Sequence, residues 1–148
     1  MRSSTSKDFS LKVMLLWTVF LLGLLFHTQL ALMPLFHGIN VAESHTHEYM
    51  NLDVIMWFML IFFGLPMLSI LGSVFWPSRR FCQIHFGMTL VYTVLNIIHF
   101  VMDVLVGAPS YQLVLMIFLV TVGLLLNVVS YYWMRSSTKD KRRFQTST

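Results

Sequence analysis

Four long apolar runs divide this chain, and they constrain its fold more than any other feature. They cover about residues 11–33, 54–75, 84–106 and 111–133. The only charged residues inside them are Lys12 and Asp103. A helix rises 1.5 Å per residue, so about 20 residues cross the roughly 30 Å of a bilayer's hydrocarbon core. Backbone amides in lipid must be satisfied within the chain, so the sequence predicts an all-α, integral membrane four-helix bundle.

Composition supports this class and sets the domain boundaries. Hydrophobic residues make up 57% of the chain and charged residues 11%, whereas soluble domains carry about 25% charged residues. We expect one membrane domain over residues 11–133, with an outer loop at 35–51. The basic segments 1–10 and 134–148 have the composition of disordered tails. The first run begins like a signal peptide, but it is longer than the apolar region of a typical signal peptide and we expect it to be retained.

The positive charges predict the orientation of the bundle. All ten Lys and Arg residues precede the first run, follow the fourth, or lie in the short turn between the second and third, apart from Lys12 at the first run's edge. They therefore share one side of a four-pass chain, which the positive-inside rule makes cytoplasmic. Both termini are expected there, in an inner or plasma membrane. The basic C-terminal run then lies near anionic lipid, so the predicted partner is the bilayer and not nucleic acid.

Polar residues in the third run follow a helical stripe. Steps of three and four residues connect His85, Thr89, Tyr92, Asn96, His99 and Asp103. Residues at these spacings share one face of a helix. An ionisable side chain is costly against lipid, so the stripe is expected to face the bundle interior or a wet cavity. It is either a hydrogen-bonded seam between helices or a functional site.

Helix geometry places two intramembrane histidines at one depth. His27 follows Lys12 by fifteen residues, and His99 follows Ile84 by fifteen, which puts both roughly 22 Å from the inner edge. Asp103 lies one turn beyond His99 on the same face. Further candidate ligands lie at the outer ends of the helices and in the outer loop: Asp53, His37, His45 and His47.

Imidazole and carboxylate together suit a transition metal ion. Copper, zinc and iron accept this ligand set, and His99 and Asp103 can reach one ion from one helix face. Alternatively, Asp103 orients the His99 ring. His45 and His47 point the same way if the loop is extended. The sequence therefore predicts a metal site near the outer face of the membrane.

Two other functions remain open from the sequence. His27 and His99 could ligate a b-type haem for electron transfer, with Gly23 and Gly87 leaving room for the macrocycle. The chain could instead be a non-catalytic accessory subunit of a larger membrane complex, or a homo-oligomer, with its polar stripe serving only to pack helices. None of the common hydrolase, nucleotide-binding or metalloprotease motifs occurs, so the residues do not decide whether the protein is an enzyme.

Overall fold

The structure is a computed structural model that describes residues 4–38 and 51–145, with side chains described at 7–38, 51 and 53–137. This part of the chain forms four helices and no strands: α1 (Ser4–Phe36), α2 (Leu52–Phe75), α3 (Arg79–Leu105) and α4 (Ser110–Gln145). All four are long and apolar enough to cross a membrane. The prediction of an all-helical, multi-pass membrane protein is confirmed at this level.

The helices extend beyond the predicted apolar runs. Helix α1 continues past Pro34 to Phe36. Proline fits a helical φ and removes only the bond to the Leu30 carbonyl, so the last turn still forms. Helix α4 continues to Gln145 through a segment rich in Lys and Arg, which are good helix formers. The division into a membrane domain and two tails stays a prediction.

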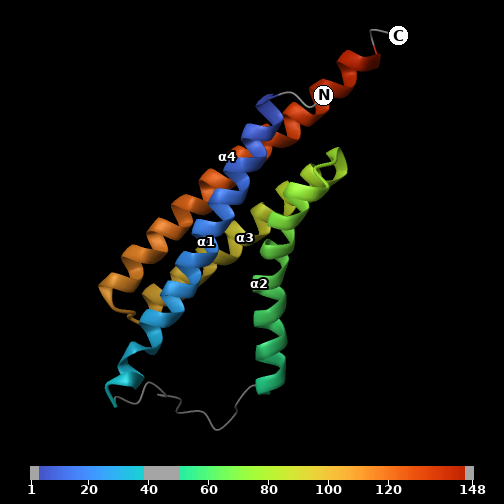
Figure 1. Cartoon of the computed structure of the whole chain (residues 1–148). Helices are drawn as coiled ribbons and strands as arrows, with labels where there is room; N and C mark the ends of the chain where they lie inside the picture. Colours follow the sequence, from blue (N-terminus) through green and yellow to red (C-terminus); the bar gives the residue numbers. More distant parts are fainter. Residues whose placement is uncertain (1–3, 39–50, 146–148) are drawn as a thin grey trace.

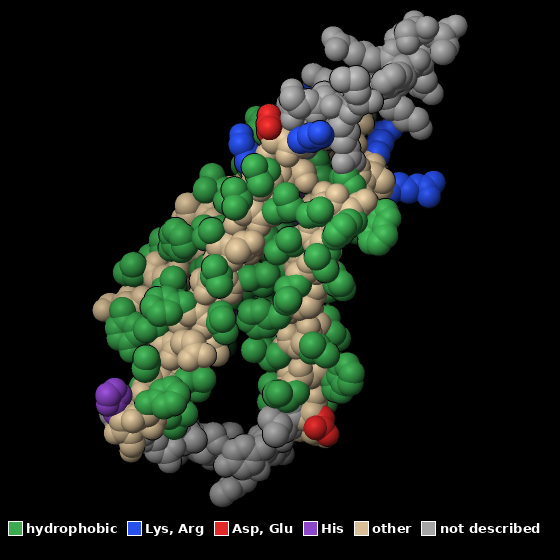
Figure 2. All heavy atoms as spheres, viewed as in Figure 1, with side chains coloured by type: hydrophobic (Ala, Val, Ile, Leu, Met, Phe, Trp, Pro, Cys, Tyr) green, Lys and Arg blue, Asp and Glu red, His purple; other side chains and the backbone are tan. Residues whose placement is uncertain are grey.

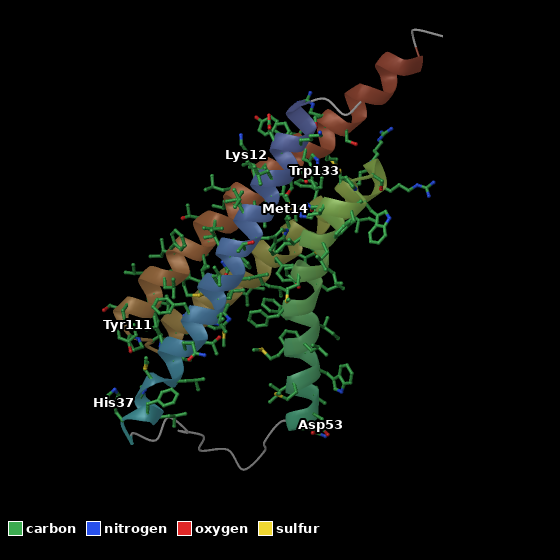
Figure 3. All side chains as sticks on the ribbon, in the orientation of Figure 1. Lys12, Met14, His37, Asp53, Tyr111 and Trp133 are labelled. Carbon is green, nitrogen blue, oxygen red and sulfur yellow. The ribbon has the colours of Figure 1, made fainter. Side chains whose placement is uncertain are left out.

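Three helices form the packed core, and the fourth diverges from them. Helix α4 lies against both α1 and α3, whereas α2 leaves the bundle as it runs toward the Asp53 end (Figures 1 and 3). The fully buried side chains come mainly from α1, α3 and α4, among them Trp17, Phe20, Met116, Leu119, Leu126 and Trp133. Most apolar side chains of α2 are exposed, as expected for a helix facing lipid.

The two ends of the bundle differ in charge. The described Lys and Arg side chains gather at one end, and α1 begins and α4 ends there (Figures 1 and 2). His37, Asp53 and Tyr111 lie at the opposite end (Figure 3). The chain therefore crosses back and forth with both termini on one side. That this side is the cytoplasm remains a prediction.

A buried hydrogen bond fixes the core near the basic end. The Trp17 indole N–H donates to Nε2 of His85 across 2.8 Å, and both residues are almost fully buried. An indole nitrogen can only donate, so His85 accepts at Nε2 and carries its proton on Nδ1. His85, which begins the polar stripe, is thus held as a neutral imidazole in the α1–α3 contact.

Two prolines free backbone carbonyls on α2, and hydroxyl groups from other helices bind them. Pro66 has no N–H for the carbonyl of Phe62, which accepts a 2.7 Å hydrogen bond from the Tyr92 hydroxyl on α3. Pro77 likewise gives no N–H to the carbonyl of Ser73. Ser10 on α1 donates to that oxygen across 3.0 Å. Two of the contacts that hold α2 to the bundle therefore form where its own helical bonds are missing.

The Trp17–His85 bond predicts a stability difference between two tryptophan substitutions. Trp17→Phe leaves the buried His85 Nε2 without a donor and should lower the free energy of unfolding by about 1–3 kcal/mol. Trp57, which is 65% exposed on α2, provides the control, and Trp57→Phe should change little. Thermal unfolding in detergent measures both. Equal effects would contradict a structural role for the bond.

The Tyr92–Phe62 bond predicts a coupling between Tyr92 and Pro66. Tyr92→Phe removes the donor and should cost about 1–2 kcal/mol of stability, because the Phe62 carbonyl is left unpaired in an apolar setting. In a Pro66→Ala background the alanine N–H can pair with that carbonyl, so Tyr92→Phe should cost less. A double-mutant cycle on unfolding measures the coupling. Additive effects would show that the proline does not create the need for the hydroxyl.

Candidate metal site between α1 and α3

Helices α1 and α3 bring three of the predicted ligands together in the half of the bundle away from the basic end. His27 comes from α1, while His99 and Asp103 lie one turn apart on α3. Each residue offers one ligand atom, and these atoms lie within 4.8 Å of one another. In the described part of the chain, these are the only residues found to form such a group. The equal depth and the shared helix face inferred from the sequence account for this convergence.

Close packing of α1 on α4 helps to place His27. Gly23 lies one turn before His27, and a β-carbon there would collide with the Leu119 side chain of α4. The sequence suggested that Gly23 leaves space for a cofactor. In the structure Leu119 fills that space. The glycine therefore allows two helices to approach closely, as small residues do in membrane bundles.

The Asp103 carboxylate lies close to both imidazoles. His27 Nε2 is 3.3 Å from Oδ2, and His99 Nε2 is 3.5 Å from Oδ1. Charge-assisted N–H···O bonds are about 2.7–2.9 Å long, so both contacts are longer than good hydrogen bonds. Asp103 Oδ2 and His27 Nδ1 are buried and have no hydrogen-bond partner among the described residues. The three side chains thus converge without satisfying one another.

The group is nearly compact enough to surround one ion. Ligand atoms about 2.0–2.2 Å from an ion in tetrahedral geometry are separated by roughly 3.3–3.6 Å. The His27 and His99 nitrogens lie 3.3 and 3.5 Å from different Asp103 oxygens, and one ligand atom from each residue lies within 4.8 Å of the others, so the side chains have to move slightly closer to share one ion. A single ion bound to both imidazoles would satisfy the carboxylate as well. Three protein ligands leave a fourth position open, as in zinc sites that bind water or substrate.

Exposure differs sharply across the group. The side chains of His27 and Asp103 are 9% and 16% exposed, whereas that of His99 is 52% exposed. The first four members of the polar stripe, His85 to Asn96, are buried as expected. The stripe therefore faces the bundle interior along most of α3. At His99 it reaches a cavity between α1, α2 and α3.

The other predicted ligands lie elsewhere or outside the described residues. His37 is exposed at the end of α1, and Asp53 is exposed at the start of the diverging α2 (Figure 3). Neither belongs to the group formed by His27, His99 and Asp103. His45 and His47 lie in residues 39–50, which the structure does not describe.

The geometry gives little room for a haem between the two histidines. The His27 and His99 rings contact edge to face, with centroids 5.3 Å apart and planes at 74°. A bis-histidine haem needs its iron between the imidazoles and its macrocycle passing between the rings. Asp103 also lies within 3.5 Å of the Nε2 atoms of both rings. The arrangement fits a small ion better than a macrocycle.

No relative adds to this geometry. No family model matches the chain, and no curated protein or solved structure is significantly similar to it. The function must therefore be argued from the residues of this chain alone.

Sequence reasoning did not find two features beside the group. One is the Tyr92–Phe62 bond. Pro66, four residues after Phe62, could have predicted it, because a proline there leaves the Phe62 carbonyl without its helical N–H partner. The other is the role of Asn96, which was placed on the polar stripe but not connected to a cavity. Both side-chain amide atoms of Asn96 are buried without a hydrogen-bond partner among the described residues. Nothing in its spacing distinguishes it from a packing residue.

Proposed function

We propose that this protein binds a transition metal ion, copper, zinc or iron, through His27, His99 and Asp103. The observation that carries the proposal is the convergence of two imidazoles and a carboxylate at separations suited to one ion. Imidazole ligands favour these metals over magnesium or calcium. An ion also provides the missing partner for the buried Asp103 oxygen.

The simpler alternative is a polar seam that only holds helices together. Residues nearer the basic end fit that description, because Trp17 bonds His85 and Asn127 donates to the Thr93 hydroxyl across 2.9 Å. Buried polar atoms without a hydrogen-bond partner occur there too, such as His85 Nδ1 and Asn127 Oδ1, but the group formed by His27, His99 and Asp103 differs in joining two imidazoles and a carboxylate. Its members approach one another closely but make no good hydrogen bond. Intramembrane ionisable groups arranged in this way point to a ligand.

Metal content tests the proposal directly. The full chain, purified without chelator, is equilibrated with each metal and its bound ion is measured by elemental analysis. His27→Gln, His99→Gln and Asp103→Asn should each lower the affinity by about tenfold or more, because each removes one of three protein ligands. His37→Gln and Asp53→Asn are the matched controls and should bind like the unaltered chain. Unchanged binding in all three site variants would sink the proposal.

An absorption spectrum separates this proposal from its haem rival. A b-type haem held by His27 and His99 would give the strong Soret band of a ligated porphyrin, whereas a metal ion alone would not. We expect no Soret band in protein purified from haem-sufficient cells. A Soret band that corresponds to one haem per chain and disappears in His27→Gln would overturn the metal proposal in favour of haem binding.

We further propose that the metal group lies in the outer half of the membrane, with both termini in the cytoplasm. The gathering of basic side chains at the end where α1 begins supports this orientation (Figure 2). In a Cys82→Ser background, His37→Cys should react with a membrane-impermeant maleimide in intact cells. Thr148→Cys should react only after lysis. Labelling of Thr148→Cys but not His37→Cys in intact cells would show the opposite topology.

A further inference from the structure

A cavity of about 530 Å³ lies between α1, α2 and α3, beside the metal group. Its volume falls in the range of sites that bind small organic molecules, about 300–1,000 Å³. His27, His99 and Asp103 form one wall together with Asn96. The rest is almost entirely apolar. A metal ion would occupy only a small part of this space, so the cavity has room for a second, larger ligand.

The cavity opens sideways toward the lipid. Phe58, Ile98 and Val106 line it, and all three are more than half exposed. The divergence of α2 produces this opening, which is visible between α2 and the other helices (Figure 2). A molecule dissolved in the bilayer can therefore enter without crossing water.

Asn96 supplies a specific polar contact in this apolar space. The residue is only 4% exposed, and neither its amide nitrogen nor its oxygen has a hydrogen-bond partner among the described residues. Leaving such a group unpaired away from water is unfavourable. A ligand head group with an oxygen that accepts, and a hydroxyl or water that donates, would satisfy the amide.

Charge and shape restrict the head group further. The lining residues include no Lys or Arg to pair with an anionic head such as a fatty acid or a phosphate. Phe58, Phe62 and Phe63 of α2 line the opposite side, and aromatic faces favour a flat ring. The ring of Phe62 is held in place by that of Tyr92, with centroids 5.0 Å apart. The cavity thus matches an uncharged ring with an oxygen substituent.

We propose that this cavity binds an uncharged, lipid-soluble molecule with a ring-shaped carbonyl or hydroxyl head group, the chemistry of a quinone or quinol. The head lies against Asn96, and the apolar tail leaves between α2 and α3 into the bilayer. This proposal does not depend on the metal, because Asn96 and the phenylalanines are outside the ligand group. If both sites were filled, the head group would lie in the cavity beside His27, His99 and Asp103, which line the same wall.

The test uses the full chain in lipid nanodiscs with decylubiquinone as the probe. We expect saturable binding of one molecule per chain, measured by equilibrium dialysis. Asn96→Leu should weaken binding about tenfold, the effect of losing one good hydrogen bond. Asn127→Leu is the matched control, because Asn127 is a part-buried amide on α4 that does not line the cavity. It should bind the probe like the unaltered chain.

A second pair of variants keeps the test valid if Asn96→Leu does not fold. Met102 lines the cavity and is exposed, so Met102→Trp should block the opening without straining the core. Val101 is similarly exposed but does not line the cavity, and Val101→Trp should have no effect. Absence of saturable binding, or equal losses in variant and control, would overturn the proposal.

Two further measurements test the ring and the independence of this ligand from the metal. Dioctanoylglycerol is an uncharged lipid without a ring, and it should bind at least about tenfold more weakly than the quinone; equal or tighter binding would overturn the ring assignment. Quinone binding measured after chelator treatment should persist. Quinone binding without any metal binding would leave this proposal standing and remove the metal proposal. Metal binding without quinone binding would overturn the quinone proposal and leave the metal proposal standing.

Discussion

In hydrocarbon, every backbone carbonyl and amide must find its partner inside the protein, and this requirement shapes the bundle beyond its helix content. Pro66 and Pro77 each leave a carbonyl of α2 unpaired, and hydroxyl groups from Tyr92 and Ser10 bind them. These bonds hold α2 at its middle and at the basic end. No comparable bond among the described side chains holds the part of α2 before Phe62. The cavity opens at that part of the helix.

The predictable part of the structure follows from regular geometry. The lengths of the apolar runs predict the four helices. A rise of 1.5 Å per residue predicts that His27 and His99, on different helices, lie at the same depth. The three-and-four spacing put Asp103 beside His99. All three then meet in the structure. These inferences needed only properties of a single straight helix and the alternation of direction across the membrane.

The remaining features depend on how helices pack, which one sequence specifies weakly. The divergence of α2 separates Asp53 from the group, although its depth made it a reasonable ligand (Figure 3). The Trp17–His85 bond depends on the rotation of α1 against α3. Asn96 occupies the same stripe as Thr89, and only the position of α2 shows that it lines a cavity. Such facts follow from side-chain contacts between helices rather than from periodicity.

Both halves of α3 hold buried polar atoms without a partner, His85 Nδ1 among them, but the half that contains Asn96 and Asp103 also lines a cavity, which favours function over packing there. Near the basic end, His85 makes a cross-helix hydrogen bond, as residues that join membrane helices do. In the other half, Asn96 makes none with either amide atom, and Asp103 keeps a buried oxygen without a hydrogen-bond partner among the described residues. A sequence selected only for helix packing would gain stability by replacing these two side chains with apolar ones. The loss of stability that Asn96 and Asp103 cause is explained if ligands bind there, an ion at the carboxylate and an oxygen-bearing head group at the amide.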